Sequence, residues 1–459
     1  MSSTPTAPRD AAPTTDAPDG PLRRTIGRKV LLLFVVGDIL GAGIYALTGK
    51  VAAEVGGAIW VPFLVAFCLA ALTAGSYVEL VGRYPHAAGA ALYANRAFRR
   101  PFVTFLVAFA VMMSGVTSAA AAARAFGGDY LAEFVSVPTV LAAWVFLGLV
   151  TLINVVGISE SVRVNVVLTL IELTGLLVVV VIGVWSVATG QGDVGRAMTL
   201  EGDGGSVLLG VLGGTALAFY ALLGFEDSVN LAEECREPRR DFPRAVFGGL
   251  AATGVIYLAV AFTSSMLVET EVLVDSSGPL LEVVKVAGVP FPPALFALIA
   301  LLAVGNTALI NMIMASRLVY GMAQEGIVPR LLGRVHERRR TPWVAIAFTL
   351  AVALTLVSTG DLAGLADTTV LLLLLVFAVV NVCVLVLRRT DPGEEGHFRV
   401  ATWVPVAGAV VSLVLASPLT GRDASVYLTA GLLLGIGVVL YAVNRVLVRR
   451  QETADAGQG

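Results

Sequence analysis

The sequence predicts an all-α integral membrane protein, and three features of its composition and pattern support this fold class. Of the 459 residues, 57% are hydrophobic and only 14% are charged, against about 45–50% and about 25% in soluble domains. The apolar residues gather into runs of the ~20 residues that a helix needs to cross a bilayer. The Lys and Arg residues gather between these runs. Together these features exclude a soluble enzyme, a disulfide-rich secreted domain and a disordered chain.

Twelve apolar spans lie between two polar tails, and each span is too long for a buried strand. Residues 1–28, rich in Ser, Thr, Pro and Asp, predict a disordered cytoplasmic tail. Residues 449–459 form a second cytoplasmic tail. The predicted spans cover 30–48, 57–81, 101–126, 138–156, 164–189, 207–230, 244–268, 292–322, 342–358, 362–387, 404–419 and 425–447.

The basic residues support both this number of spans and one orientation. An error of one helix would invert every later loop and scramble the bias of Lys and Arg toward the cytoplasm. With the N-terminus inside, the basic residues that fall outside are only 5 of the 31, namely Lys50, Arg124, Arg196, Lys285 and Arg422. We therefore predict a multi-pass protein of the cytoplasmic (inner) membrane with both termini in the cytoplasm. Short Arg-rich loops beside apolar spans indicate topology, so no nucleic-acid partner is predicted.

Helix breakers interrupt the first span. Its segment 37–45, GDILGAGIY, places three glycines and the carboxylate of Asp38 in the middle of an apolar helix. Unwound backbone at membrane depth leaves polar groups that cost several kcal/mol each in lipid, so it occurs where it lines a protein or water cavity. Close packing of helices through small residues is the alternative explanation for the glycines.

The sixth span has a matching interruption. Its segment 219–227, FYALLGFED, again places a glycine and two acids inside an apolar run. Span one is the first of five and span six is the first of the next five, which is the arrangement of an inverted repeat whose broken helices meet at the midplane. The pair of interruptions favours a substrate site over packing. It divides the chain into a first repeat, 29–189, a second repeat, 206–387, and two further helices in 403–448.

The ends of two broken helices suit a small zwitterion. Free amides at the start of the resumed first helix, at Ala42, Gly43 and Ile44, carry partial positive charge and attract a carboxylate. Carbonyls at the ends of the preceding half-helices can accept hydrogen bonds from an ammonium group. These carbonyls belong to Ile39, Tyr220, Ala221 and Leu223. Together with Gly41 and Gly224 at the breaks, these residues form the predicted binding site for an α-amino acid.

Five short motifs, in order along the chain, resemble those of one known family. They are Gly41-Ala42-Gly43, the segment 84–93 (YPHAAGAALY), Tyr220 with Gly224-Phe225-Glu226, the segment 232–243 (AEECREPRRDFP) and the segment 316–329 (SRLVYGMAQEGIVP). The family is that of the amino acid–polyamine–organocation permeases, and the likeness covers nearly the whole chain. The resemblance implies the family's LeuT-like fold, with two inverted five-helix repeats, two extra helices and broken helices 1 and 6. It also implies a substrate carboxylate at Gly43 and an aromatic gate at Tyr220.

Acidic residues inside the spans raise the question of ion coupling. A bare charge there costs about 2.5–3.5 kcal/mol or more, so each acid is paired, wet or protonated. Glu172, Glu226 and Asp38 are the predicted proton-coupling residues. Some members of the family have a lysine where Glu172 falls, so the resemblance leaves the coupling ion open. A sodium ion would instead use Asn306 and Thr307, because hard cations prefer oxygen ligands, although hydrogen bonding between helices also explains this pair.

We predict a secondary active transporter, a permease that moves α-amino acids by alternating access with proton coupling. The alternatives are an amine or polyamine exchanger, which the intramembrane acids favour, and a sodium-coupled amino acid symporter. An intramembrane enzyme is the alternative from another class. However, His86, His336 and His397 lie in loops without a nucleophile or metal-ligand spacing, so no catalytic residue, cofactor or metal is predicted. The expected partners are the amino acid, the coupling proton or sodium ion, and membrane lipid.

The predicted site leads to one expectation about a variant. Gly43→Val should abolish binding by filling the space that the carboxylate approaches, with folding largely kept.

Overall fold

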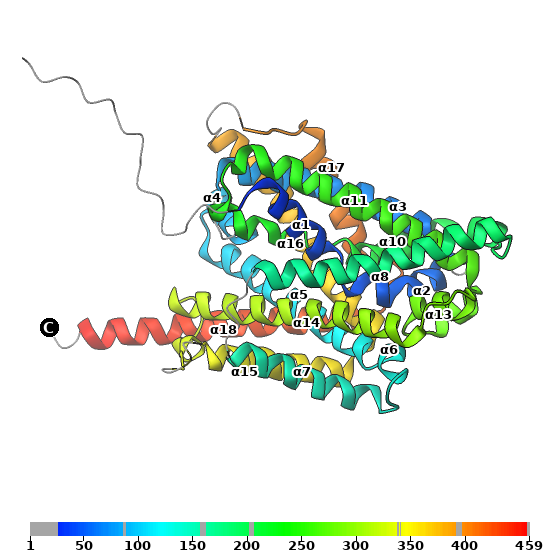
Figure 1. Ribbon diagram of the computed structural model, residues 1–459. Helices are drawn as coiled ribbons and strands as arrows, with labels where there is room; N and C mark the ends of the chain where they lie inside the picture. Colours follow the sequence, from blue (N-terminus) through cyan, green and yellow to red (C-terminus); the bar gives the residue numbers. More distant parts are fainter. Residues whose placement is uncertain are drawn as a thin grey trace, which may run out of the picture.

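The computed structural model describes residues 26–85, 89–156, 162–201, 206–336, 339, 341–391 and 397–456, and these residues form helices and their connections. Residues 1–25 of the predicted first tail, 86–88 of one motif and 457–459 of the second tail lie outside the described residues. The long helices pack side by side in one bundle (Figure 1). The C-terminal helix α18 (Ala424–Ala456) extends beyond the others at one end of this bundle.

Helices long enough to cross a membrane account for most of the predicted spans. Among the described residues, eight single helices are long and apolar enough, and a ninth span is a pair of helices bent by 40°. The eight are α3 (Trp60–Arg83), α5 (Pro101–Phe126), α7 (Thr139–Val156), α8 (Val162–Thr189), α11 (Pro238–Leu267), α14 (Pro293–Gln324), α16 (Leu362–Thr390) and α18. The bent pair consists of α1 (Arg28–Ile39) and α2 (Ala42–Val55).

Three shorter apolar helices coincide with the remaining predicted spans. They are α10 (Val207–Ala221), α15 (Trp343–Thr359) and α17 (Trp403–Ala416). That all twelve segments cross a bilayer as two inverted repeats stays a prediction. Short helices occupy the connections, namely α4 (Gly89–Phe98), α6 (Asp129–Ala132), α9 (Val194–Met198), α12 (Thr270–Asp275), α13 (Pro279–Val286) and the 3-10 helices η2 (Asp227–Glu234), η3 (Arg330–Gly333) and η4 (Pro418–Thr420).

Large apolar side chains cover the outside of the bundle. On α7, which packs with α15 at one edge (Figure 1), Leu141, Trp144 and Leu149 are each about half exposed. On α8, Val181 and Val184 are two-thirds exposed. A surface of this kind is stable against lipid and not against water. The apolar helices and this surface indicate a multi-pass membrane protein, whereas the membrane and the orientation stay predictions.

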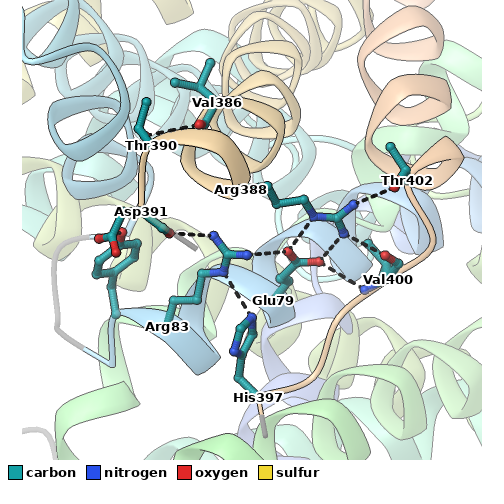
Figure 2. Close-up of polar contacts among 10 residues, drawn as sticks. Glu79, Arg83, Val386, Arg388, Thr390, Asp391, His397, Val400 and Thr402 are labelled. Carbon is teal, nitrogen blue, oxygen red and sulfur yellow. Dashed lines mark hydrogen bonds and ion pairs between the residues drawn. The ribbon is translucent and has the colours of Figure 1, made fainter. Parts of the chain in front are cut away.

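A buried ion network joins the end of α3 to α16 (Figure 2). Glu79 is completely buried, and its carboxylate accepts hydrogen bonds from Arg388 Nε at 2.8 Å and Nη2 at 2.5 Å. Arg83, one turn further along α3, lies 3.4 Å from the same carboxylate. Arg83 also donates to His397 Nε2 at 3.1 Å and to the Asp391 carbonyl at 3.2 Å. Paired, charge-assisted hydrogen bonds of this geometry are strong and orient both partners.

The same network holds the connection between α16 and α17 in place. The Val400 N–H donates to the Glu79 carboxylate at 3.0 Å, and the Val400 carbonyl accepts from Arg388 at 2.6 Å. Arg388 also donates to the Thr402 hydroxyl at 3.1 Å. One carboxylate thus organises two helices and the connection after α16 (Figure 2).

At the other end of the bundle, Asp129 at the start of α6 holds the connection between α12 and α13. Its carboxylate accepts hydrogen bonds from the Ser276 hydroxyl at 2.9 Å and from the Ser277 N–H at 2.8 Å. The Ser277 hydroxyl in turn accepts a hydrogen bond from the Asp129 N–H at 2.9 Å.

Removal of Glu79 should destabilise the protein strongly. Glu79→Ala leaves two buried guanidinium groups without their carboxylate, and breaking a buried ion pair costs about 3–5 kcal/mol. We expect a large loss of monodisperse protein after heating, measured by size-exclusion chromatography in detergent. As a control, Glu282→Ala removes a partly exposed ion pair with Lys285, which should cost about 1 kcal/mol or less. If Glu79→Ala and Glu282→Ala lost the same fraction of monodisperse protein, the Glu79 network would stabilise the protein no more than an exposed ion pair does.

Candidate functional site

The first break lies between α1 and α2. The last hydrogen bond of α1 runs from the Leu40 N–H to the Val36 carbonyl at 2.8 Å, and α2 begins at Ala42 with Gly41 as its N-cap residue. Gly41 has no side chain to cap the helix, and Thr307 of α14 supplies the cap instead. Its Oγ1 accepts a hydrogen bond from the Ala42 N–H at 3.0 Å. The expectation that the Ala42 amide is free is therefore wrong, because a side chain from a distant helix already occupies it.

The second break follows α10. After Ala221 the chain forms a turn over residues 222–226 and continues as the 3-10 helix η2. The Leu223 N–H donates to the Tyr220 carbonyl at 3.3 Å, which closes the end of α10. Gly224 has a φ of +122°, a conformation that residues with a Cβ rarely adopt. The Glu226 carboxylate folds back and accepts a hydrogen bond from the Gly224 N–H at 2.9 Å.

The two breaks lie directly against each other, backbone to backbone. A Cβ built on Gly43 would lie 2.5 Å from Ala221 Cα. A Cβ built on Gly224 would overlap the carbonyl group of Asp38. The start of α2 therefore faces the end of α10, and the end of α1 faces the turn after α10. The facing interruptions predicted from the two glycine-containing segments are present in the structure.

A cavity with an empty volume of about 1070 Å³, its open mouth included, lies beside the breaks. Helices α5 and α14 contribute most of the remaining wall, and α3, α4, η2 and α16 contribute the rest. The predicted site residues that line it are Asp38, Ile39, Gly41, Ala42, Gly43, Tyr220, Ala221, Leu223, Gly224, Glu226 and Thr307. Three other predicted residues, Ile44, Glu172 and Asn306, are buried in contact with the surrounding helices rather than in the described lining.

Several lining residues gave no sequence signal of their own. Tyr77, Asn230, Asn311 and Thr369 line the cavity from α3, η2, α14 and α16. Their residue types are common in membrane helices, so only the packing of the bundle identifies them. The described lining contains three acidic side chains and no Lys, Arg or His.

Tyr220 bridges two helices across the cavity. Its hydroxyl lies 3.0 Å from the hydroxyl of Ser118 on α5 and donates to the Ser118 carbonyl at 3.3 Å. Tyr220, Ala42 and Gly43 are buried, whereas Asp38 and Asp227 are partly exposed. Lining residues on η2, α5 and α14, such as Asn230, Val111 and Leu318, are also partly exposed, so the cavity opens between these elements and Tyr220 lies in its closed part.

Glu172 lies behind the first break. Its Oε1 accepts a hydrogen bond from Asn306 Nδ2 at 3.2 Å, and its backbone carbonyl accepts from the Tyr45 hydroxyl at 2.7 Å. Two carboxylate oxygens here, Glu172 Oε2 and Asp38 Oδ2, are buried without a hydrogen-bond partner among the described residues. Glu172, predicted for a proton, thus contacts Asn306, predicted for a sodium ion. No group of three or more His, Cys, Asp or Glu side chains in the described part of the chain could hold a metal ion.

The carbonyl of Ile39 is also occupied. It accepts a hydrogen bond from the Tyr257 hydroxyl of α11 at 2.7 Å. This carbonyl and that of Tyr220 therefore each accept one hydrogen bond within the protein, although a carbonyl oxygen has two lone pairs and can accept a second. Tyr257 and the capping role of Thr307 are features of the site that sequence analysis missed.

Comparisons with known proteins agree on one family. A family model described as "Amino acid permease" matches residues 26–438. An uncharacterized transporter of Mycobacterium tuberculosis is 29% identical, with 96% of each chain covered. A chloroplastic cationic amino acid transporter of Arabidopsis thaliana is 27% identical, covering 95% of this chain and 80% of its own. A methylthioribose transporter of Bacillus subtilis is 25% identical, and the match covers 92% of this chain and 93% of the transporter.

The contact between the breaks changes what is expected of variants at Gly43. The expectation that Gly43→Val leaves folding largely intact is wrong, because even the first side-chain carbon would meet the backbone of Ala221. We expect Gly43→Ala and Gly224→Ala to destabilise the protein by roughly 1–3 kcal/mol or more, the cost of overpacking. Thermal unfolding of purified protein measures this loss.

A matched control lies on α18. A Cβ on Gly435 would meet nothing within 4 Å, and alanine favours a helix over glycine by up to about 1 kcal/mol. Gly435→Ala should therefore leave the unfolding temperature unchanged or slightly higher. Wild-type stability of Gly43→Ala would contradict the close contact between the breaks.

Proposed function

The chain belongs to the amino acid permease family, and on this premise we propose that it is a secondary active transporter that carries α-amino acids across the cytoplasmic membrane by alternating access. The observation that carries the proposal is the cavity beside two facing helix breaks. Helix termini at such a place offer amides and carbonyls without intrahelical partners. A pocket with a positive pole and a negative pole suits a solute that has both charges.

The carboxylate of the substrate would bind at the start of α2. The amides of Gly43 and Ile44 lie in the first turn, where a helix has no internal acceptor and carries partial positive charge. Of these two residues Gly43 lines the cavity and Ile44 lies behind it, so the Gly43 amide is the first contact of the carboxylate. The Ala42 N–H already donates to the Thr307 hydroxyl. The anion site therefore has one free amide fewer than the sequence alone suggests.

The ammonium group would bind on the opposite side of the cavity. The carbonyls of Ala221 and Leu223 lie at the end of α10, where the negative end of the helix dipole favours a cation. Asp38 and Asp227 are partly exposed in the same cavity and add negative charge. An amine without a carboxylate could bind the carbonyls and acids on this side but would have no group for the amides at the start of α2. For this reason we favour an amino acid over an amine or polyamine.

The proposed mechanism uses a pair of five-helix repeats, 29–189 and 206–387, with two further helices in 403–448. The first helix of each repeat is the one that is broken, as expected of a LeuT-like fold. The described state has its cavity open between η2, α5 and α14, at the end that the basic residues place in the cytoplasm. Transport would require a second state that closes this end and separates Tyr220 from Ser118.

We propose that a proton is the coupling ion and that Glu172 binds it. Glu172 is buried beside the first break, and one of its oxygens has no described partner. A proton there would remove a charge whose burial in the membrane is costly. One extra charge moved inward gains about 2.3 kcal/mol per 100 mV, enough to concentrate a zwitterion roughly 50-fold.

Sodium coupling has less support at the residues named for it. The Thr307 hydroxyl accepts from the Ala42 N–H and donates to the Ala303 carbonyl at 3.3 Å. The Asn306 amide donates to Glu172. Both side chains thus hydrogen-bond to neighbouring groups of the protein, which explains their presence without an ion.

The substrate class can be tested by thermal stabilisation. A panel of the twenty amino acids, common amines and methylthioribose should show stabilisation by one or more amino acids, worth about 2.7 kcal/mol at ~100 times the Kd. The matching amine without a carboxylate and the matching acid without an amine serve as controls for each hit. Stabilisation by amines alone would overturn the amino acid class and support the exchanger.

The coupling ion can be tested in reconstituted vesicles. An acid-outside gradient should drive accumulation of the substrate in the wild type, and Glu172→Gln should lose this accumulation while it retains counterflow exchange. Glu282→Gln removes the same charge at a partly exposed site and should behave like the wild type. Accumulation driven by a sodium gradient and not by a proton gradient would show that the proton is not the coupling ion.

A further inference from the structure

A groove lies on the surface where three of the candidate membrane spans end. It has an empty volume of about 1560 Å³, open solvent at its mouth included. Its walls come from Asn95 of α4, the start of α5, the residues that follow α14 and residues 441–445 of α18. The apolar span of α5 begins at Pro101, that of α14 ends at Gln324 and that of α18 ends at Val446. The groove therefore lies at the depth where hydrocarbon gives way to lipid headgroups.

Two arginines flank this groove. Arg100 precedes α5, Arg445 lies near the end of the α18 span, and both side chains are exposed. Neither forms an ion pair with any residue that the structure describes. Glu325 also lines the groove but pairs with neither arginine among these residues, so the described lining keeps a net charge of +1. Guanidinium groups bind phosphate through paired hydrogen bonds.

Aromatic side chains form the wall on the lipid side. Phe102 is 42% exposed, and its ring meets that of Tyr441 edge to face at a centroid distance of 5.4 Å. Tyr441 also packs on Phe105 at 5.0 Å. Aromatic rings are typical of the membrane interface, where one part of the ring is apolar and the other is wet. The Asn444 amide donates to the Gly326 carbonyl and so holds α18 against the end of α14.

The exposed apolar surface of the groove is the ring of Phe102, which follows Arg100 by two residues. The acyl chain of a lipid whose headgroup occupies the groove can lie against this ring. A soluble anion would leave the ring without a partner.

We propose that this groove is a binding site for an anionic phospholipid, with the lipid phosphate between Arg100 and Arg445 and an acyl chain against Phe102. The position at the interface, the two guanidinium groups without an ion-pair partner among the described residues, and the exposed ring of Phe102 each meet one part of such a lipid. Basic pockets between membrane helices on the cytoplasmic side are suited to anionic headgroups. The inference requires only that the chain lies in a membrane, and it is independent of the substrate.

Native mass spectrometry of the purified protein tests the proposal by titration with phosphatidylglycerol and phosphatidylcholine. Each arginine near the surface contributes about 1 kcal/mol toward an anionic lipid. At 1.4 kcal/mol per tenfold, we expect Arg100→Gln/Arg445→Gln to weaken phosphatidylglycerol binding roughly 30-fold, and Arg445→Gln alone roughly 5-fold. Phosphatidylcholine binding should not change.

Two control variants separate a site from general surface charge. Arg330→Gln/Arg334→Gln removes the same charge from exposed positions outside the groove and should weaken phosphatidylglycerol binding about 3-fold or less, since exposed charges beyond a Debye length are screened. Glu325→Gln removes a carboxylate from the groove and should tighten binding.

Two results would overturn the proposal. The first is an equal loss of phosphatidylglycerol binding in the two double variants, Arg100→Gln/Arg445→Gln and Arg330→Gln/Arg334→Gln. Such a result would mean that the lipid is attracted by the general positive charge of this face. The second is displacement of the lipid by millimolar inorganic phosphate, which would mean a site for a soluble anion. The arginines are exposed, so the variants are expected to fold, and size-exclusion profiles confirm this before titration.

Discussion

The contact between the two interrupted helices is the constraint on which the rest of the site depends. Gly43 lies against the backbone of Ala221, and Gly224 lies against the carbonyl of Asp38. Unwound backbone in a bilayer needs internal partners, because lipid offers none. The two breaks can exist because they meet inside the protein, and a glycine at each contact allows the approach. The cavity lies beside this contact and takes its wall from both breaks.

Side chains from other helices, and one from the second break itself, satisfy much of the exposed backbone before any ligand binds. Thr307 accepts from the Ala42 amide, the Tyr257 hydroxyl donates to the Ile39 carbonyl, and Glu226 accepts from the Gly224 amide. These hydrogen bonds fix the positions of the helix ends, so the remaining amides and carbonyls are preorganised for a solute. The same bonds restrict which backbone groups a substrate can use.

The acidic residues of the spans have different surroundings, which gives them different chemistry. Glu79 is paired with arginines and fixes the end of the bundle. Glu226 closes a turn, and Asp38 lies at the cavity. Glu172 has an amide partner on one oxygen and no described partner on the other. A buried carboxyl with an unsatisfied oxygen is the kind of group that a proton stabilises.

The sequence by itself determined the helical class, the positions of the helices and the two interruptions, because span length and helix breakers are local properties of the chain. The motif at 84–93 indicated a connection but not the helix α4 within it. Only the tertiary structure decided the partners, because Thr307 and Tyr257 lie 265 and 218 residues from the groups that they contact. It also decided that a side chain at Gly43 would meet the backbone of Ala221, since the sequence shows that a glycine is present but not which backbone lies against it.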